Sequence, residues 1–387
     1  MLNKKTYFWL SLAIMAAVTI NLRAPINSMG PSIEAIRAYY GISSSVAGLL
    51  NSIPLIAFGS ISFIVAYFSN TKILFIALCA IALGEVVRSF CGVGGLFVGM
   101  ALMGAGIAVG NVVIPSFVKK KFPKNAPTMM SVYSLFLNLS SILGIALALP
   151  LIDALGIRLA MFVWIGFALI AIVLFYPEIK NHRFSRPKPK QLATKSLLAN
   201  KNAWRITLFM GLQGFVAYCT FTWLPLIIAS KGYSLEYGTR LLLYMQLASF
   251  PVAMLGPLAI SKMRERYKPW YMAAICGMYV VGYVMILLLD SRAALLFSMV
   301  CIGIPMGGVF GLALLFIAQK SANTAIAIKL SAMAQGFGYL IAASGPFLVG
   351  LLHDMSEGYT AGIFLVLIVA ILLNICGIFT QKCKMVE

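Results

Sequence analysis

Long apolar stretches recur along the chain, and short polar segments separate them. Each stretch is too long for a buried strand and comes close to the roughly 20 residues that a helix needs to cross a bilayer. Because the lipid interior offers no water to backbone N–H and C=O groups, stretches of this kind are expected to be α-helices. The sequence predicts twelve spans, at 7–36, 43–68, 72–90, 94–118, 127–150, 158–177, 204–229, 237–261, 269–290, 293–319, 326–352 and 360–380.

The predicted spans form two sets of six on either side of a polar stretch. Short patterns recur between the sets: Ser-x-Pro-x-x-x-x-Gly begins at Ser52 in the second span and at Ser249 in the eighth. Internal repeats of this kind are common in membrane transporters. We therefore predict an all-α integral membrane protein whose twelve transmembrane helices form two parallel six-helix repeats, with an N-terminal bundle at 1–177, a cytoplasmic basic linker at 178–203 and a C-terminal bundle at 204–387.

Composition agrees with this architecture and excludes others. Of the 387 residues, 61% are apolar and 10% are charged, and the mean hydropathy is +0.96. Soluble domains have roughly 45–50% apolar and about 25% charged residues, so a soluble enzyme, a disordered chain and a disulfide scaffold are excluded. Lys4 and Lys5 precede the first apolar stretch, which lacks a convincing cleavage site, and we expect an uncleaved first helix.

The excess of basic residues predicts an orientation. The chain has 30 Lys and Arg against 10 Asp and Glu, a net charge of +20. With the N-terminus inside, 23 basic residues fall in cytoplasmic loops and tails, and six lie at the outer rim, Arg88 among them. Membrane proteins concentrate Lys and Arg in cytoplasmic loops. We therefore expect a multi-pass membrane protein with both termini in the cytoplasm and no nucleic-acid partner.

Arg23 is the basic residue that lies inside a span. It is on the order of 20 Å from either end of the first helix, and a charge at that depth costs at least about 2.5 kcal/mol unless it faces a cavity or a partner. Two interpretations stay open: a structural arginine paired with carbonyls or a carboxylate, or a fixed positive charge for an anionic or electron-rich substrate. Neighbours on the same helical face are Thr19, Asn27 and Glu34, and residues that would open the backbone ladder are Pro25, Gly30 and Pro31.

Polar side chains also mark other spans. Asn111 follows the small-residue pair Gly106 and Gly110 of the fourth span, which permits close helix packing, and Phe310 stands near the corresponding position of the tenth. Each polar residue either joins neighbouring helices or lines a cavity, and convergence from both halves would indicate a binding site. The polar stripes are Ser131, Ser134, Asn138 and Ser141 in the fifth span, Gln213 and Thr220 in the seventh, Gln246 in the eighth, and Ser331, Gln335 and Gly338 in the eleventh.

Acidic residues are nearly absent from the spans. Glu85 lies three residues before Arg88, so it either forms an intrahelical pair that neutralises both side chains or serves in a proton relay. Glu34, near the outer end of the first span, is the second candidate for proton coupling. The pair His353-Asp354, at the outer end of the eleventh span, is interpreted as a helix-end feature.

Motifs for catalysis are missing from the sequence. Two His residues cannot build a His-rich metal site, and the seven Cys show no CxxC spacing. The sequence contains no Walker A motif, so ATP is not the expected energy source. We therefore expect no enzyme activity, no catalytic residues, no metal and no cofactor.

Four stretches carry a resemblance to a known family. They are Asn21-Leu22-Arg23-Ala24-Pro25, GAGIAVGNVVIPSFVKKKFP at 104–123, FMGLQGFVAYCTFTWLP at 209–225 and LSAMAQGFGYLIAASGPFLVGLLHD at 330–354. In these stretches the chain resembles the cyanate permease/nitroimidazole transporter branch of the bacterial major facilitator superfamily. The resemblance implies a twelve-helix fold in the bacterial inner membrane, a central cavity lined by spans 1, 4, 7 and 10, and alternating access for small polar or anionic solutes. It also supports Arg23, Asn111 and Gln335 as residues that face the route.

We therefore predict a monomeric secondary transporter that moves a small anionic or planar polar solute, cyanate-like or nitroimidazole-like, by alternating access. The alternatives are a proton-driven exporter of drug-like compounds with the same fold, and a membrane sensor without transport. The expected partners are a small-molecule substrate and the lipid bilayer. The predicted substrate-binding residues are Arg23, Asn27, Asn111, Asn138, Gln213, Tyr218, Thr220, Phe310 and Gln335, and those for proton coupling are Glu85 and Glu34.

Overall fold

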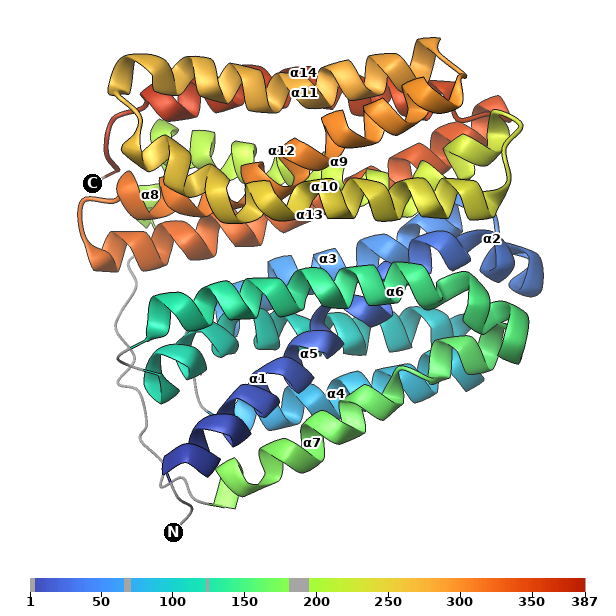
Figure 1. The fold of residues 1–387 in the computed structure, drawn as a ribbon, viewed down its shortest axis with the longest axis horizontal. Helices are drawn as coiled ribbons and strands as arrows, with labels where there is room; N and C mark the ends of the chain where they lie inside the picture. The colour runs from blue at the N-terminus through green and yellow to red at the C-terminus, as the bar shows by residue number, and fades with distance from the viewer. Residues whose placement is uncertain (1–3, 66–70, 123–124, 181–194, 387) are drawn as a thin grey trace. The chain divides into compact units, whose positions relative to one another are not determined.

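The computed structural model describes residues 4–65, 71–122, 125–180 and 195–386. In these parts of the chain the structure consists of α-helices joined by short connections (Figure 1). A 3-10 turn, η1 (Glu265–Tyr267), precedes α11. The helices are α1 (Lys4–Asn27), α2 (Met29–Tyr40), α3 (Ser44–Val65), α4 (Thr71–Phe90), α5 (Gly92–Lys121), α6 (Ala126–Phe162), α7 (Ile165–Lys180), α8 (Lys195–Leu198), α9 (Lys201–Ser230), α10 (Leu235–Lys262), α11 (Lys268–Leu288), α12 (Arg292–Gln319), α13 (Thr324–Ser356) and α14 (Thr360–Lys382).

Helices cover the described parts of all twelve predicted spans, which confirms the all-α fold; residues 66–68 of the predicted second span lie outside the described residues. Within the described ranges, ten helices are long and apolar enough to cross a membrane. The predicted sixth span contains α7, which is a shorter apolar helix, and the predicted eighth span is covered by the 28-residue α10. Most of the predicted linker, residues 181–194, lies outside the described part of the chain.

Two interruptions of the helices agree with the prediction, and both depend on the backbone. The first span is divided by a break at Ser28, as the nearby Pro25 led us to expect. The range of α6 runs to Phe162, but its backbone is not helical at Gly156, and this kink lies in the gap predicted between the fifth span, ending at 150, and the sixth, beginning at 158. Gly156 has a φ of 75°, a left-handed conformation that glycine adopts without steric cost. The sixth span therefore consists of the end of α6 together with α7.

Contacts divide the chain into two compact units. Unit 1 comprises residues 1–41 and 56–190, and unit 2 comprises residues 42–55 and 191–387. The division passes through α3, whose first part belongs to unit 2. The bundle boundaries predicted at 177 and 204 stay a prediction.

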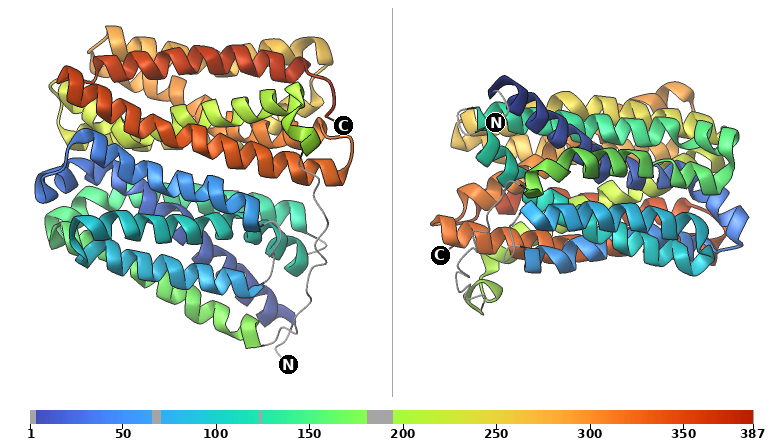
Figure 2. Two further views of the ribbon diagram at one scale, coloured as in Figure 1. Left: turned by 180° about the vertical axis from the view of Figure 1, so that it is seen from behind. Right: turned by 90° about the horizontal axis from the view of Figure 1, so that it is seen from below.

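Equivalent helices pair within the two units. In unit 1, α1 packs against α6, and α4 packs against α5 and α7. In unit 2, α9 packs against α13, and α11 packs against α12 and α14. The view from behind in Figure 2 shows α4 lying along α5 and α13 lying beside α14. Because each pairing joins helices in the same order within its half, the packing confirms the parallel six-helix repeats.

Small residues allow the closest helix contacts. A Cβ added at Gly144 of α6 would collide with the carbonyl oxygen of Ala24 in α1. In unit 2, a Cβ added at Gly307 of α12 would collide with the carbonyl oxygen of Ser249 in α10. Small residues are typical of membrane helix interfaces because they let backbones approach closely. The first contact places α6 directly against the part of α1 that carries Arg23.

Large apolar side chains remain exposed along the helices. Ile76 on α4, Val173 on α7 and Ile368 on α14 are 64%, 70% and 54% exposed. Soluble monomers rarely expose contiguous apolar surfaces of this kind. Lipid tails would cover these side chains in a membrane, so the exposed apolar residues agree with the spans predicted from hydropathy.

Candidate functional site

Arg23 lies in unit 1, near the midpoint of the segment that α1 and α2 form from Lys4 to Tyr40. Its side chain is half-buried, and its positive charge acts on the hydroxyl of Tyr133 in α6. Tyr133 is itself 6% exposed. The sequence did not single it out, because a tyrosine in an apolar span carries no pattern of its own. The candidate site therefore includes a buried phenol near the predicted anchor.

The hydroxyl of Ser140 interrupts the hydrogen-bond ladder of α1 beside Arg23. It donates to the carbonyl oxygen of Ile20 at 2.7 Å and accepts the N–H of Ala24 at 2.9 Å. In a regular α-helix these two backbone groups would bond to each other. A side chain inserted into this ladder bends the helix. A residue of α6 thus opens α1 at the position next to Arg23.

Asn27 also contacts α6. Its side-chain amide donates to the hydroxyl of Ser141 at 2.9 Å, and both residues are 5% exposed. Asn138 instead donates to the carbonyl oxygen of Ser134 in its own helix at 2.9 Å. The polar faces predicted for the first and fifth spans therefore meet at Asn27 and Ser141, whereas Ser140, which the predicted stripe omitted, contacts the backbone of α1.

Asn111 is half-buried on α5 next to the contact of this helix with α1. The side chain of Leu22 occupies the space that a Cβ at Gly110 would need. Because Leu22 directly precedes Arg23 and Gly110 directly precedes Asn111, this contact brings the backbones of the two predicted residues close together within unit 1.

The charges of Glu85 and Arg88 interact, but in the described part of the chain no hydrogen bond or ion pair within 4 Å joins the two side chains as the intrahelical pairing would require. Arg88 donates instead to the carbonyl oxygens of Pro25 and Met161, in two other helices. Both carboxyl oxygens of Glu85 are buried and have no hydrogen-bond partner among the described residues. Spacing along one helix could not reveal this, because carbonyl groups on distant helices compete for the guanidinium.

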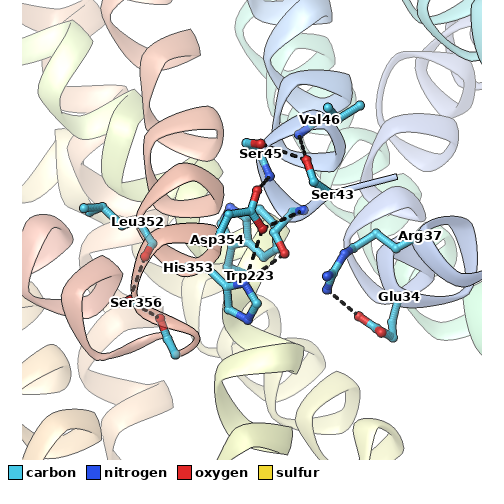
Figure 3. A network of polar contacts seen from close by, with 12 residues as sticks. Glu34, Arg37, Ser43, Ser45, Val46, Trp223, Leu352, His353, Asp354 and Ser356 are labelled. Atoms are coloured by element: carbon cyan, nitrogen blue, oxygen red, sulfur yellow. Dashed lines mark hydrogen bonds and ion pairs between the residues drawn. The ribbon is translucent and has the colours of Figure 1, made fainter. Parts of the chain in front are cut away.

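Glu34 lies at the surface of α2. Its carboxylate accepts a hydrogen bond from Arg37 at 2.9 Å, and the Glu34 side chain is 47% exposed (Figure 3). Surface pairs of this kind contribute about 0–1 kcal/mol. A role for Glu34 in proton coupling stays a prediction.

In unit 2, two of the predicted residues are buried on α9. Gln213 and Thr220 are 5% and 2% exposed. The hydroxyl of Thr220 donates to the carbonyl oxygen of Val216 at 2.7 Å and is hydrogen-bonded to the hydroxyl of Tyr283 on α11. The Thr220 hydroxyl therefore joins α9 to α11.

The predicted stripe on α13 is only partly directed toward another helix. Gln335 donates to the Ser331 hydroxyl at 2.8 Å, so two members of the stripe bond to each other. A Cβ added at Gly338 would lie 3.1 Å from the side chain of Met210 on α9. Tyr218 on α9 and Phe310 on α12 are half-buried. The structure describes the two sets of predicted residues separately, each in its own unit, and their role in substrate binding stays a prediction.

A second polar cluster joins the start of α3 to the end of α13, within unit 2 (Figure 3). The Asp354 carboxylate accepts the backbone N–H of Ser44 at 3.0 Å and that of Ser45 at 2.7 Å. The hydroxyl of Ser44 is hydrogen-bonded to His353 Nδ1 at 2.9 Å. His353-Asp354 is therefore a helix-end feature, as expected, but the helix end that it stabilises belongs to α3.

These features define a multi-pass membrane protein with buried polar residues inside its helical units. All-α units with lipid-exposed apolar faces carry buried polar residues at helix breaks, an arrangement suited to binding a solute within the membrane. Among the described residues, no three His, Cys, Asp or Glu side chains are grouped to hold a metal ion. All seven cysteines are free thiols.

Comparison with known proteins identifies the family. The Major Facilitator Superfamily profile matches residues 9–346, and the chain belongs to this superfamily. It is 35% identical to an uncharacterized transporter of Bacillus subtilis, YycB, over 97% of this chain and 94% of the relative. It is 31% identical to the 2-nitroimidazole transporter of Escherichia coli, over 96% and 95% of the two chains. The cyanate transport protein CynX of Escherichia coli is 28% identical, over 90% and 91%. The predicted resemblance is confirmed.

Solved structures agree on the fold. A bacterial homologue of the human lysosomal transporter Spinster superposes with a TM-score of 0.78 at 13% identity, over 97% of each chain. The nucleoside transporter NupG superposes with a TM-score of 0.75 at 13% identity, over 99% of this chain and 100% of NupG. At these identities the similarity establishes the major facilitator fold alone.

Proposed function

We propose that this protein is a secondary transporter of a small anionic or planar polar solute and that Arg23 anchors the solute. The observation that carries the proposal is the position of Arg23, a fixed positive charge where Ser140 opens the ladder of α1. A guanidinium presents a planar fork of N–H donors, which matches planar acceptors such as carboxylate or nitro groups. Asn27 and Tyr133 supply further polar atoms in the same part of unit 1.

Two relatives bear the names of small planar solutes, 2-nitroimidazole and cyanate, and these solutes are the natural first probes. The proposal includes alternating access, in which the six-helix halves at 1–177 and 204–387 move relative to each other. It also includes an inner-membrane location with both termini in the cytoplasm, because 23 of the 30 basic residues then lie on the cytoplasmic side.

Counterflow of a labelled solute into proteoliposomes tests the proposal. A thermal-shift screen over small anions and nitrogen heterocycles, with cyanate and 2-nitroimidazole included, selects the solute. Loss of a charge-assisted hydrogen bond costs about 1.5–3 kcal/mol, so Arg23→Ala should lower kcat/KM by about 10- to 150-fold. Arg158→Ala is the matched control, since this arginine lies over the Tyr39 ring in the same unit. Transport by Arg23→Ala at the wild-type rate would contradict the proposal.

A second candidate function, proton-driven export of drug-like compounds, is favoured by Glu85. This carboxyl group is 0% exposed, and neither oxygen has a described hydrogen-bond partner. Burial without a hydrogen-bond partner penalises a charged carboxylate, and the charge of Arg88 on the same helix offsets this penalty only in part. If Glu85 carries the coupling proton, Glu85→Gln abolishes the pH dependence of transport and Glu34→Gln preserves it. Unchanged pH dependence in both variants would argue against this function.

A further inference from the structure

Arg88 is the largest charged side chain that unit 1 buries completely. It lies in the last turn of α4 and is 0% exposed. A guanidinium carries five N–H donors and keeps its charge under all ordinary conditions, so a buried arginine needs several acceptors in fixed positions. The contacts of Arg88 therefore show what it stabilises.

Both terminal nitrogens of Arg88 donate to main-chain carbonyl groups. Nη1 donates to the carbonyl oxygen of Pro25 at 3.0 Å, and Nη2 donates to that of Met161 at 2.9 Å. Nη1 also lies 3.6 Å from the sulfur of Met29 and 3.7 Å from that of Met100. Arg88 thus connects α4 to α1 and α6 through backbone atoms.

The two carbonyl groups share a structural position. Pro25 lies in the last turn of α1, which ends at Asn27, and Met161 lies in the last turn of α6, which ends at Phe162. Carbonyl groups in the last turn of a helix lack an intrahelical donor. A positive charge at this end also interacts favourably with the helix dipole. One guanidinium therefore caps two helix ends, each at a break within a predicted span.

The capped break of α1 lies beside the proposed anchor. Pro25 follows Arg23 by two residues, and the Pro25 carbonyl oxygen also accepts the Ser28 hydroxyl at 3.1 Å. On the other side, Ser140 holds the backbone at Ala24. The backbone next to Arg23 is thus held from α6 through a hydroxyl and from α4 through a guanidinium.

We propose that Arg88 is a positioning residue: by capping the broken ends of α1 and α6 together, it fixes the backbone that presents Arg23 to the solute. The proposal rests on the proposed function of Arg23. Lysine at position 88 would keep the positive charge, but its single ammonium lacks the planar fork that reaches two carbonyl groups. Arg88→Lys therefore keeps the positive charge at position 88 and removes the pair of hydrogen bonds to the two carbonyl groups.

Amide hydrogen exchange of the purified protein tests the capping directly and needs no solute. We expect Arg88→Lys to raise exchange by about tenfold at residues 26–30, because exchange reports local opening. Residues 12–18 of the same helix should stay at wild-type rates, as should all segments in the control Arg158→Lys. Unchanged exchange at 26–30, or an equal rise throughout unit 1, would overturn the proposal.

Transport kinetics with the solute selected above test the consequence for Arg23. A variant that only folds less well lowers the maximal rate and keeps KM, whereas a misplaced anchor raises KM. We expect Arg88→Lys to raise KM by about tenfold, Arg88→Met to raise it at least as much, and Arg158→Lys to keep it.

Arg23→Lys, measured in parallel, separates the two proposals. If Arg23→Lys impairs transport and Arg88→Lys keeps the wild-type KM, the positioning role is wrong and the anchor stands. If Arg23→Lys and Arg23→Ala both transport normally, the proposed function fails, and the positioning role fails with it.

Discussion

Asp354 caps the first turn of α3 from another helix, and its removal is expected to destabilise that helix start. The two carboxylate oxygens accept separate backbone N–H groups, from Ser44 at 3.0 Å and from Ser45 at 2.7 Å. These donors belong to the first turn, where a helix has no carbonyl partners of its own. The Ser43 hydroxyl accepts the next N–H, that of Val46, at 3.3 Å.

The expected magnitude follows from these contacts. Loss of a side-chain cap costs about 0.5–2 kcal/mol, and loss of a negative charge at a helix N-terminus costs about 0.3–1 kcal/mol. Because the Asp354 side chain is 26% exposed, solvent screens part of the charge. Asp354→Ala should therefore lower the free energy of unfolding by about 1–2 kcal/mol. Asp354→Asn keeps one acceptor oxygen and should lose less than half of that amount.

Thermal unfolding of the purified protein in detergent, followed by circular dichroism, measures the effect. A loss of 1 kcal/mol lowers Tm by about 2–4 °C for a unit of this size. Asp290→Ala is the matched control, because the Asp290 carboxylate also pairs with a basic residue, Lys231, but is 73% exposed. That control should change Tm by less than about 1 °C. Equal effects of Asp354→Ala and Asp290→Ala would refute the capping argument.

Three further substitutions test other contacts. Lys121→Met should lower stability by about 3–5 kcal/mol in chemical denaturation, because it leaves the Glu178 carboxylate buried after loss of a 2.6 Å ion pair; if the double variant with Glu178→Gln is no more stable than the single one, this reasoning is wrong. Thr220→Val should cost about 1–3 kcal/mol through the buried hydroxyl of Tyr283 and leave KM unchanged; a raised KM at unchanged stability would place Thr220 in the binding site instead. Ser140→Ala should let the ladder of α1 close, with little loss of stability and a several-fold rise in KM for the selected solute; a wild-type KM would show that the opened ladder is not needed.

The architecture could be predicted because lipid imposes a strict rule on the backbone. A span must satisfy its own N–H and C=O groups, so apolar length alone indicates a helix. Interruptions of a helix are harder to predict from the sequence when they depend on side chains of other helices. The contact of the Ser140 hydroxyl with the backbone of α1 leaves no trace in hydropathy. Two interruptions were predictable: the gap predicted between 150 and 158 contains the kink at Gly156, and Pro25 lacks the N–H that the ladder needs.

The contacts of individual side chains were harder to predict from the sequence than the spans. Glu85 and Arg88 are three residues apart, which favoured a pair on one helix face. His353 and Asp354 sit at a helix end, but the helix that they contact starts about 310 residues earlier. The partners of Arg88 and Asp354 are main-chain groups of distant segments. Main-chain groups carry no sequence signal, so only the fold could identify them.

Two arginines of unit 1, Arg23 and Arg88, differ in what their surroundings leave for a solute. Arg88 is fully buried, and main-chain carbonyl groups of two helices hold both of its terminal nitrogens. Arg23 is half-buried beside the contact between Ser140 and the α1 backbone, so unit 1 does not enclose the residue completely. A solute that competed for Arg88 would have to uncap two helix ends, whereas a solute at Arg23 meets a backbone that is already held in place. Binding is therefore expected at Arg23, with an affinity that depends on Arg88.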